Sequence, residues 1–342
     1  MNKSSLCIHE FALREGNWVK FICGASNEDL TSISDLCAVY AVAGVNCIDV
    51  AADCGVVAAA REGLQLAEIN YGLRPWVIVS VSDGKDIHFR KAFFDPKICP
   101  KECKRPCEKI CPTDAISINN GVIEDLCYGC GRCIPICPIN LIAEKDNILE
   151  IEDFGELIAK TKPDAVEIHT APGRINTFES SLKSILKSQV TLKRIAVSCG
   201  LEIHGINKYQ LSQELWSRYE CLRRYRQKPI WQLDGRPMSS DIGKGTSRSA
   251  VSLFEKIHSI APPGPLQLAG GTNLHTINHL KHKNGLSGIA FGGIARKLIQ
   301  PFLIEAKSKN KKLIDYPEGW DKAVEVAKGL IKPWLNNNYQ IN

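Results

Sequence analysis

Eight cysteines between residues 99 and 138 are the residues of this 342-residue chain whose type and spacing indicate chemistry most clearly. They form two runs, and each run ends in a Cys-Pro pair. The second run has the spacing Cys-x2-Cys-x2-Cys-x3-Cys-Pro, with which bacterial ferredoxins bind [4Fe–4S] clusters. Gly129 and Gly131 would let this loop fold tightly around inorganic sulfur. The pattern predicts two [4Fe–4S] clusters.

The first run is stretched by one residue at each of its first two gaps, so it is a variant of the second. In paired runs of this kind the fourth cysteine of each run binds the other run's cluster. The ligands predicted for one cluster are Cys99, Cys103, Cys107 and Cys137. Those predicted for the other are Cys111, Cys127, Cys130 and Cys133. A hairpin pattern over residues 115–124 would space the two clusters.

Zinc ribbons and disulfides are the alternatives for these cysteines. Zinc sites use Cys-x2-Cys pairs without a third cysteine and a closing Cys-Pro, which disfavours zinc. The amino terminus shows no secretory signal pattern, so we expect a cytoplasmic protein whose fifteen cysteines stay reduced. A further alternative is that the clusters only hold the fold together. Most of the seven other cysteines are expected to be small buried hydrophobic residues, although Cys23, Cys54 and Cys199 at strand ends could instead bind a metal.

Composition excludes several functional classes. Hydrophobic residues make up 44% of the chain and charged residues 23%, and no 18-residue apolar run occurs, so no membrane span is expected. The net charge of +6 is dispersed. The one dense basic run, residues 307–312, lacks interleaved aromatic residues, and we interpret it as a solvated loop rather than a nucleic-acid site.

Outside the cysteine runs, short β-branched segments alternate with helical patterns, which is typical of parallel βαβ units. The eight predicted strands are Val19–Cys23, Cys47–Ala51, Trp76–Val81, Ala165–His169, Arg194–Ser198, Pro229–Leu233, Leu266–Leu268 and Gly288–Phe291. Helical patterns follow them, the last over Gly319–Leu335. Eight repeats favour an α/β fold, a TIM-like (β/α)8 barrel. We expect residues 1–92 and 150–342 to form this barrel, interrupted after its third strand by a ferredoxin-like two-cluster domain at residues 93–149.

Polar residues recur on one face of several predicted strands and should converge inside the barrel. They are Lys20, Asp49, Glu167, His169, Gln232 and Asp234. Two interpretations stay open: a buried polar network that only fixes the barrel, and a substrate or cofactor pocket.

Glycine pairs follow the last two strands, where barrels bind phosphate through backbone amides and a helix N-terminus. The residues predicted to bind such a ligand are Gly270, Gly271, Thr272, Gly292, Gly293 and Arg296. The ligand would be FMN or a phosphorylated metabolite.

With these motifs in place, the chain resembles the cyanobacterial light-dependent period (LdpA) family of iron–sulfur proteins. Besides the cysteine runs, the segments that carry the resemblance are residues 16–26, 47–53, 88–92 and 235–239. The resemblance implies a protein with two iron–sulfur clusters that adjusts circadian period to light through cellular redox state. It also implies clock input proteins as partners.

Two functions compete on this basis. The first is a redox sensor that follows electron-transport components and passes the signal on by a change in conformation or binding. The second is a flavin- or ferredoxin-linked oxidoreductase whose clusters feed a barrel cofactor. Because no base, nucleophile or hydride-acceptor motif is recognisable, the sensor is preferred, and whether the protein is an enzyme stays open. A sensor should change around residues 82–91 and 234–247 on reduction.

Overall fold

Eight parallel strands close into a barrel, as the alternation of strand and helix patterns predicts. The computed structural model describes residues 3–72, 74–200, 205–236 and 243–335. In chain order the barrel strands are β1 (Trp18–Gly24), β2 (Cys47–Ala51), β3 (Trp76–Ser82), β8 (Ala165–His169), β9 (Arg194–Cys199), β10 (Pro229–Asp234), β11 (Leu266–Ala269) and β12 (Gly288–Phe291). Each strand pairs with its neighbours in chain order, and β1 closes the barrel on β12. The (β/α)8 barrel is thereby confirmed.

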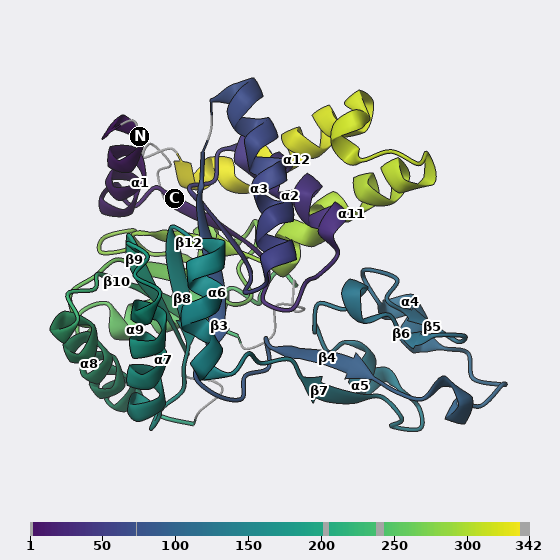
Figure 1. Ribbon diagram of the computed structural model, residues 1–342, viewed down its shortest axis with the longest axis horizontal. Coiled ribbons are helices and arrows are strands. Elements are labelled where there is room, and N and C mark those ends of the chain that lie inside the picture. Colours follow the sequence, from purple (N-terminus) through teal and green to yellow (C-terminus); the bar gives the residue numbers. More distant parts are fainter. Residues whose placement is uncertain (1–2, 73, 201–204, 237–242, 336–342) are drawn as a thin grey trace.

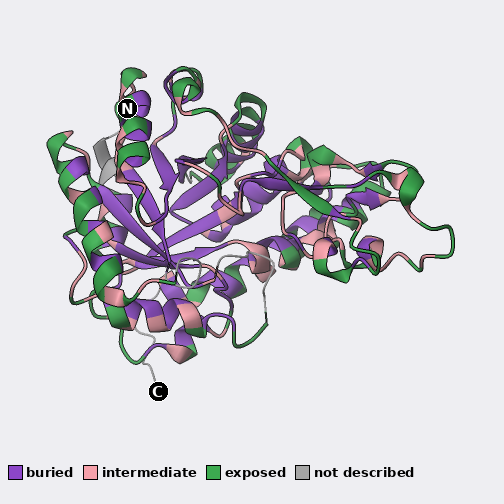
Figure 2. Ribbon diagram, turned by 90° about the horizontal axis from the view of Figure 1, so that it is seen from below, coloured by how far each residue is buried: buried purple, intermediate pink, exposed green. Residues whose placement is uncertain are grey.

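Helices cover the outside of the barrel (Figure 1). They are α2 (Leu30–Ala43), α3 (Cys54–Tyr71), α6 (Phe154–Thr161), α7 (Ile175–Lys187), α8 (Lys208–Arg224), α9 (Arg248–Ile257), α10 (Thr276–His279), α11 (Gly293–Ser308) and α12 (Pro317–Leu335). The sequence has helical patterns over Arg248–Ile260 and Thr276–Lys283, but the helices that form there are shorter. The chain turns at residues 258–260, and α10 ends at His279. Figure 2 shows the buried strands at the centre and the exposed outer faces of the helices.

One helix was missed by the sequence analysis. Helix α1 (Lys3–Glu15) precedes β1 and packs at the amino-terminal ends of the strands. There Leu13 joins an apolar cluster that includes Trp18, Trp76 and Ile78. Glu10 accepts hydrogen bonds from Arg194, the first residue of β9. This end of the barrel interior is therefore apolar and closed, which leaves the carboxyl ends of the strands for function.

The eight cluster cysteines lie in a lobe between β3 and β8, which we call the cysteine lobe (residues 90–146; Figure 1). Strand β4 (Arg90–Phe93) pairs antiparallel with β7 (Ala143–Asp146), so strand pairing in the lobe begins at Arg90. The predicted hairpin is present as β5 (Ile116–Ser117) and β6 (Gly121–Val122). Short helices α4 (Pro106–Ile110) and α5 (Cys133–Ile136) complete the lobe. The ferredoxin-like insert after the third strand is confirmed, whereas its limits at residues 93 and 149 stay a prediction.

A lysine holds the lobe against the barrel. Lys91 on β4 is buried, and its ammonium donates to Glu28 at 2.7 Å and to the carbonyl oxygen of Glu124 at 2.8 Å. Asn147 donates to the same Glu28 carboxylate, at 3.3 Å. Because Glu28 belongs to the loop after β1, these contacts place the lobe at the carboxyl ends of the strands.

Candidate functional site

The structure gathers the cysteines in two groups of four. One small cavity in the lobe is lined by all four cysteines predicted for one cluster, Cys111, Cys127, Cys130 and Cys133. Cys111 comes from the first run and the other three from the second, so the runs cross over as the ferredoxin pattern predicts. That these sulfurs bind a cluster stays a prediction.

The second group is formed by Cys99, Cys103, Cys107 and Cys137. Cys99 lies close enough to Cys103 and Cys137 for the neighbouring thiols to raise its pKa, next to the main cause, desolvation. Cys137 also faces Cys107. The stretched spacing of the first run is taken up by a turn at Arg105, which adopts φ +50°, directly before α4. The variant run therefore still brings its three thiols to the thiol of Cys137.

Backbone amides point at the cysteine sulfurs, as iron–sulfur sites require. The amides of Ala92, Ala115 and Leu141 donate to the Sγ atoms of Cys127, Cys111 and Cys137 at 3.2–3.4 Å. Such N–H···S bonds tune the potential of a bound cluster. A zinc ion would draw its sulfurs to within ~4 Å of one another, given Zn–S bonds of ~2.3 Å. No three thiol sulfurs among the described residues approach one another within 4.8 Å. The residues present fit iron–sulfur clusters better than zinc.

The thiols also show what cluster binding must overcome. Burial, and then the neighbouring thiols, raise the pKa of Cys133 to about 12. Burial likewise raises the pKa of Cys130. For Cys137 burial acts in the same direction, but the amides of residues 139–142 outweigh it and its pKa is lowered. Since the thiolate is the metal ligand, cluster assembly must displace protons from the buried thiols.

A cavity of ≈ 60 Å³ lies at the carboxyl ends of the barrel strands, between the barrel and the cysteine lobe. All six residues predicted to bind a phosphate-bearing ligand line it: Gly270, Gly271, Thr272, Gly292, Gly293 and Arg296. From the lobe, Tyr128, Gly129 and Cys130 line the same cavity. The loop that carries predicted cluster ligands is thus also a wall of the barrel cavity. Ligand binding by the six residues stays a prediction.

The two glycine pairs differ in what requires them. Gly270 and Gly271 have φ +67° and +80°, and a Cβ on Gly270 would lie 2.5 Å from the carbonyl oxygen of Arg236. Packing and turn geometry alone therefore explain that pair. A Cβ on Gly292 would meet only ordinary contacts, at 3.6 Å or more. Gly292 is the N-cap of α11, and no side chain caps this helix. Gly292 and Gly293 both line the cavity, so the second pair carries the phosphate prediction.

Arg296 links the barrel to the lobe. Its guanidinium donates to the carbonyl oxygens of Ile22 and Cys23 at the end of β1, at 2.9 and 3.1 Å. The same group lies over the ring of Tyr128, 4.3 Å from the ring centroid. This cation–π contact is buried on the arginine side, since Arg296 is 4% exposed. A shift of the Tyr128 loop therefore acts directly on the end of β1 and the start of α11.

The polar strand residues converge inside the barrel as predicted. The ammonium of Lys20 donates to Asp49 at 2.9 Å and also to Glu167. Gln232 donates to Glu167 at 2.6 Å and to Asp234 at 3.3 Å. Lys20 does not line the cavity, whereas the three carboxylates do. The network is buried, and its three carboxylates line the cavity, but whether the cavity binds a substrate or cofactor stays a prediction.

The carboxylates of this network titrate differently. Burial opposes the charge of Glu167, but Lys20 and then His169 outweigh it and lower the pKa of Glu167 to about 2. Asp49 lies next to both Lys20 and Glu167, and burial leaves its pKa raised. Burial raises the pKa of Asp234 to about 6, although His88 and His169 counteract it. The pKa of Asp234 therefore lies close to neutral pH.

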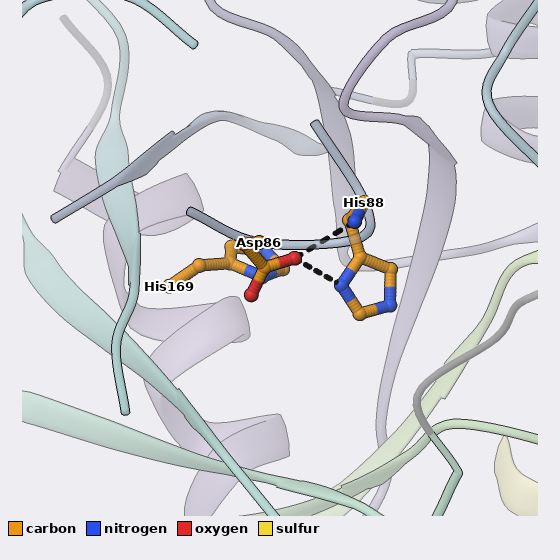
Figure 3. Close-up of side chains that lie close together, drawn as sticks. All are labelled: Asp86, His88 and His169. Carbon is orange, nitrogen blue, oxygen red and sulfur yellow. Dashed lines mark hydrogen bonds and ion pairs between the residues drawn. The ribbon is translucent and has the colours of Figure 1, made fainter. Parts of the chain in front are cut away.

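Sequence analysis missed two residues at this site. Asp86 and His88 lie in the loop between β3 and β4, next to His169 at the end of β8 (Figure 3). His88 belongs to a segment that carries the family resemblance, which was the only sequence signal. The segments 235–239 and 234–247 lie partly outside the described residues, at positions 237–242.

Among the described residues, the cysteines outside the lobe do not gather at a site. Cys23, Cys37, Cys47, Cys199 and Cys221 are buried, as expected for small hydrophobic residues. Cys54 opens α3 and is exposed. No three-ligand group among the described residues contains Cys23, Cys54 or Cys199.

Fold and site together define an iron–sulfur-binding protein built on a (β/α)8 barrel, and the comparisons agree with this class. The "LdpA Fe-S cluster-binding domain" matches residues 99–148, and the "Light dependent period A C-terminal domain" matches residues 157–333. The chain is 41% identical to Light dependent period A of Synechococcus elongatus, over 94% of this chain and 92% of that protein. It belongs to the light-dependent period A family.

Further likenesses are local or distant. A ferredoxin of Methanocaldococcus jannaschii is 33% identical over 73 residues, which are 20% of this chain and 39% of that protein. Tryptophan synthase of Mycobacterium tuberculosis is similar over 98% of both chains, with 8% identity and a TM-score of 0.48. None of the described helices is long and apolar enough to cross a membrane.

Proposed function

We propose that this protein is a cytoplasmic redox sensor whose two [4Fe–4S] clusters set the conformation of the barrel mouth, through which it modulates circadian period in response to light. One observation carries the proposal: residues 128–130 form a wall of the barrel cavity. They directly follow the predicted cluster ligand Cys127 and include the predicted ligand Cys130. Clock input proteins would read the change, and electron-transport components would supply it.

Charge is the signal in this proposal. A bound [4Fe–4S] cluster exchanges one electron, which changes the charge of its site by one unit. At an effective dielectric of ~20, a unit charge ~8 Å away changes the energy of an ionised group by about 2 kcal/mol. That is enough to move a two-state equilibrium more than tenfold. Asp234, Glu167 and the Arg296 guanidinium are the cavity groups that would respond.

The contact between Tyr128 and Arg296 gives this response a path. Tyr128 directly follows Cys127, and Arg296 holds both β1 and α11. Removing the aromatic ring should uncouple lobe from barrel and leave the cysteines in place. Tyr128→Leu tests this, and Tyr128→Phe, which keeps the ring, is its matched control.

A redox sensor acts through a change of conformation and needs no catalytic turnover of a substrate. We expect limited proteolysis around residues 82–91 to differ between the oxidised and reduced forms in wild-type protein and in Tyr128→Phe, but not in Tyr128→Leu. Electron transfer to small acceptors should not exceed that of a free two-cluster ferredoxin. Proteolysis that is identical in both redox states, together with rapid reduction of a specific metabolite, would make the protein an oxidoreductase instead.

The cluster content is tested separately. Anaerobically purified protein should carry about eight irons, as two four-iron clusters require. Cys133→Ser should lose about half of the iron, and Cys221→Ser, which alters a buried cysteine outside the lobe, should lose none. Bound zinc without sulfide would contradict the proposal.

A second candidate function is a flavin- or ferredoxin-linked oxidoreductase. It is favoured by the uncapped N-terminus of α11, which faces the cavity beside Cys130 and could bind the phosphate of FMN or of a metabolite. Gly292→Asp should abolish such binding, whereas Gly292→Ala should retain it because the added Cβ meets no close contact. If denatured protein releases no flavin, and neither FMN nor phosphorylated metabolites bind, the glycines serve only as turns.

A further inference from the structure

Asp86, His88 and His169 form a cluster outside the cysteine lobe (Figure 3). One donor atom from each residue lies within 4.8 Å of the other two. Asp86 and His88 come from the loop after β3, and His169 from the end of β8, so two barrel strands position the group. His88 and His169 also line the barrel cavity. The cluster therefore lies in the wall of an accessible space.

The hydrogen-bonding partner of His169 fixes its tautomer. Its Nε2 lies 3.1 Å from Oε1 of Glu167. Lys20 and Gln232 both donate to that carboxylate, and the Lys20 ammonium balances its charge, so Glu167 is ionised and can only accept. The Nε2 atom of His169 must therefore carry a proton. A neutral imidazole then presents an unshared electron pair at Nδ1.

The Nδ1 atom of His169 is the unusual feature. It is buried and has no hydrogen-bond partner, although His169 is 6% exposed. It faces Oδ2 of Asp86 at 3.7 Å, too far for a hydrogen bond. The other Asp86 oxygen, Oδ1, accepts from the backbone amide of His88 at 2.8 Å and contacts Nδ1 of His88 at 2.7 Å. Two electron-pair donors thus face each other across a gap that suits a cation.

We propose that Asp86, His88 and His169 bind a divalent first-row transition-metal ion. Two imidazoles and one carboxylate form a donor set that suits zinc or iron(II), whereas magnesium and calcium prefer oxygen alone. With metal–ligand bonds of ~2.0–2.2 Å, two ligands of one ion lie ~3–4 Å apart, which matches the gap between His169 and Asp86. Three protein ligands leave further coordination positions for water or a small ligand in the cavity.

Glu167 supports this site as a positioning residue. A carboxylate that accepts from the distal nitrogen of a ligating histidine fixes its orientation and raises its basicity. Because Glu167 also accepts from Lys20, the site is joined to the buried network of the barrel. The proposal does not depend on the redox role of the cysteine lobe.

A proton is the alternative occupant. Without an ion, burial lowers the pKa of His169, but the neighbouring carboxylates of Asp86 and Glu167 outweigh it and place that pKa well above the usual value. In that case the group is a hydrogen-bonded imidazolium between two carboxylates, and no metal binds. The two alternatives differ in measurable metal content and coordination.

The test uses Zn²⁺ as the probe on anaerobically purified, cluster-loaded protein. We expect equilibrium dialysis to give one zinc per chain in addition to the cluster iron. Zinc X-ray absorption should show only nitrogen and oxygen ligands, at ~2.0–2.1 Å. Sulfur at ~2.3 Å as the main scatterer would place the ion on cysteines and overturn the proposal.

Variants locate the ion. His88→Ala and Asp86→Asn should weaken zinc binding at least tenfold, and both alter a loop rather than a barrel strand. His282→Ala removes an exposed histidine in the segment between α10 and β12 and should bind zinc like the wild type. Full iron content and an unchanged circular dichroism spectrum show that each variant is folded. Absence of zinc from the wild type, or undiminished zinc in His88→Ala, would overturn the proposal.

Discussion

At the residue scale, Gly129 is the position where cluster loop and lobe framework are most tightly fitted. It has φ +72°, and a Cβ there would overlap the carbonyl oxygen of Arg90 on β4. The tight turn of the cysteine loop needs glycine first because its backbone has positive φ. The packing needs it second because a Cβ would overlap Arg90. Sequence analysis recognised the first reason from the spacing of the run. It could not recognise the second, because the contact joins residues far apart in the chain.

Gly129→Ala should therefore lower both iron content and stability. Left-handed backbone costs a non-glycine residue roughly 1–2 kcal/mol, and displacing β4 adds to that cost. Gly173→Ala is the control, since Gly173 has φ +78° but open space around it. We expect iron analysis and thermal unfolding to show a large loss for Gly129→Ala and only the backbone cost for Gly173→Ala. Equal effects would show that the contact with β4 is unimportant.

Asp234 should make stability depend on pH. Burial raises its pKa from 3.8 to about 6 in the folded protein, so the folded state holds the proton more tightly than the unfolded state. This group's contribution to stability is present below pH 3.8 and is lost as pH rises through about 6. Asp234→Asn keeps the shape and removes the charge.

The variant should consequently gain more stability relative to wild type at pH 8 than at pH 5, where only about half of the effect is present. A shift of this size corresponds to up to about 3 kcal/mol at the higher pH. Urea denaturation at both pH values measures the difference. A gain that is the same at pH 5 and pH 8 would mean that Asp234 does not titrate in this range.

At the element scale, the strands could be predicted and some helices could not. Each barrel strand is a short apolar or β-branched run between turn residues. Because helices cover the outer face of the strands, the outward side chains are apolar as well, which makes the runs easy to recognise. Helix α1 lacks such a signal, because only one face touches the barrel and Phe11 is half exposed. Asp86 and His88 lie in a loop, where no periodicity shows which side chains will meet.

The role of α1 can be tested through Leu13. This side chain is 2% exposed and packs with Trp18 and Trp76 at the closed end of the barrel. Leu13→Ala should destabilise the protein by about 2–5 kcal/mol, the usual range for a buried leucine. Phe11→Ala, on the exposed face of the same helix, should cost far less. Chemical denaturation compares the two, and equal small losses would show that α1 does not contribute to the core.

At the scale of the whole molecule, the barrel and the cysteine lobe share one cavity. The eight β/α repeats and the cysteine spacing predicted both units, and the glycine pairs predicted which barrel end would matter. The sequence could not show that Tyr128 would reach Arg296, because that contact depends on how Lys91 and Glu28 hold the lobe. The function proposed here rests on that junction.

Hydrogen–deuterium exchange of the cluster-loaded protein in its oxidised and reduced forms tests this junction most directly. Exchange should differ between the two forms at residues 125–131 in the lobe and also at residues 292–298 at the start of α11. In Tyr128→Leu the difference should remain in the lobe and disappear at α11, while Tyr128→Phe behaves like wild type. A redox-dependent difference confined to the lobe in the wild-type protein would contradict the proposal that the barrel senses cluster state.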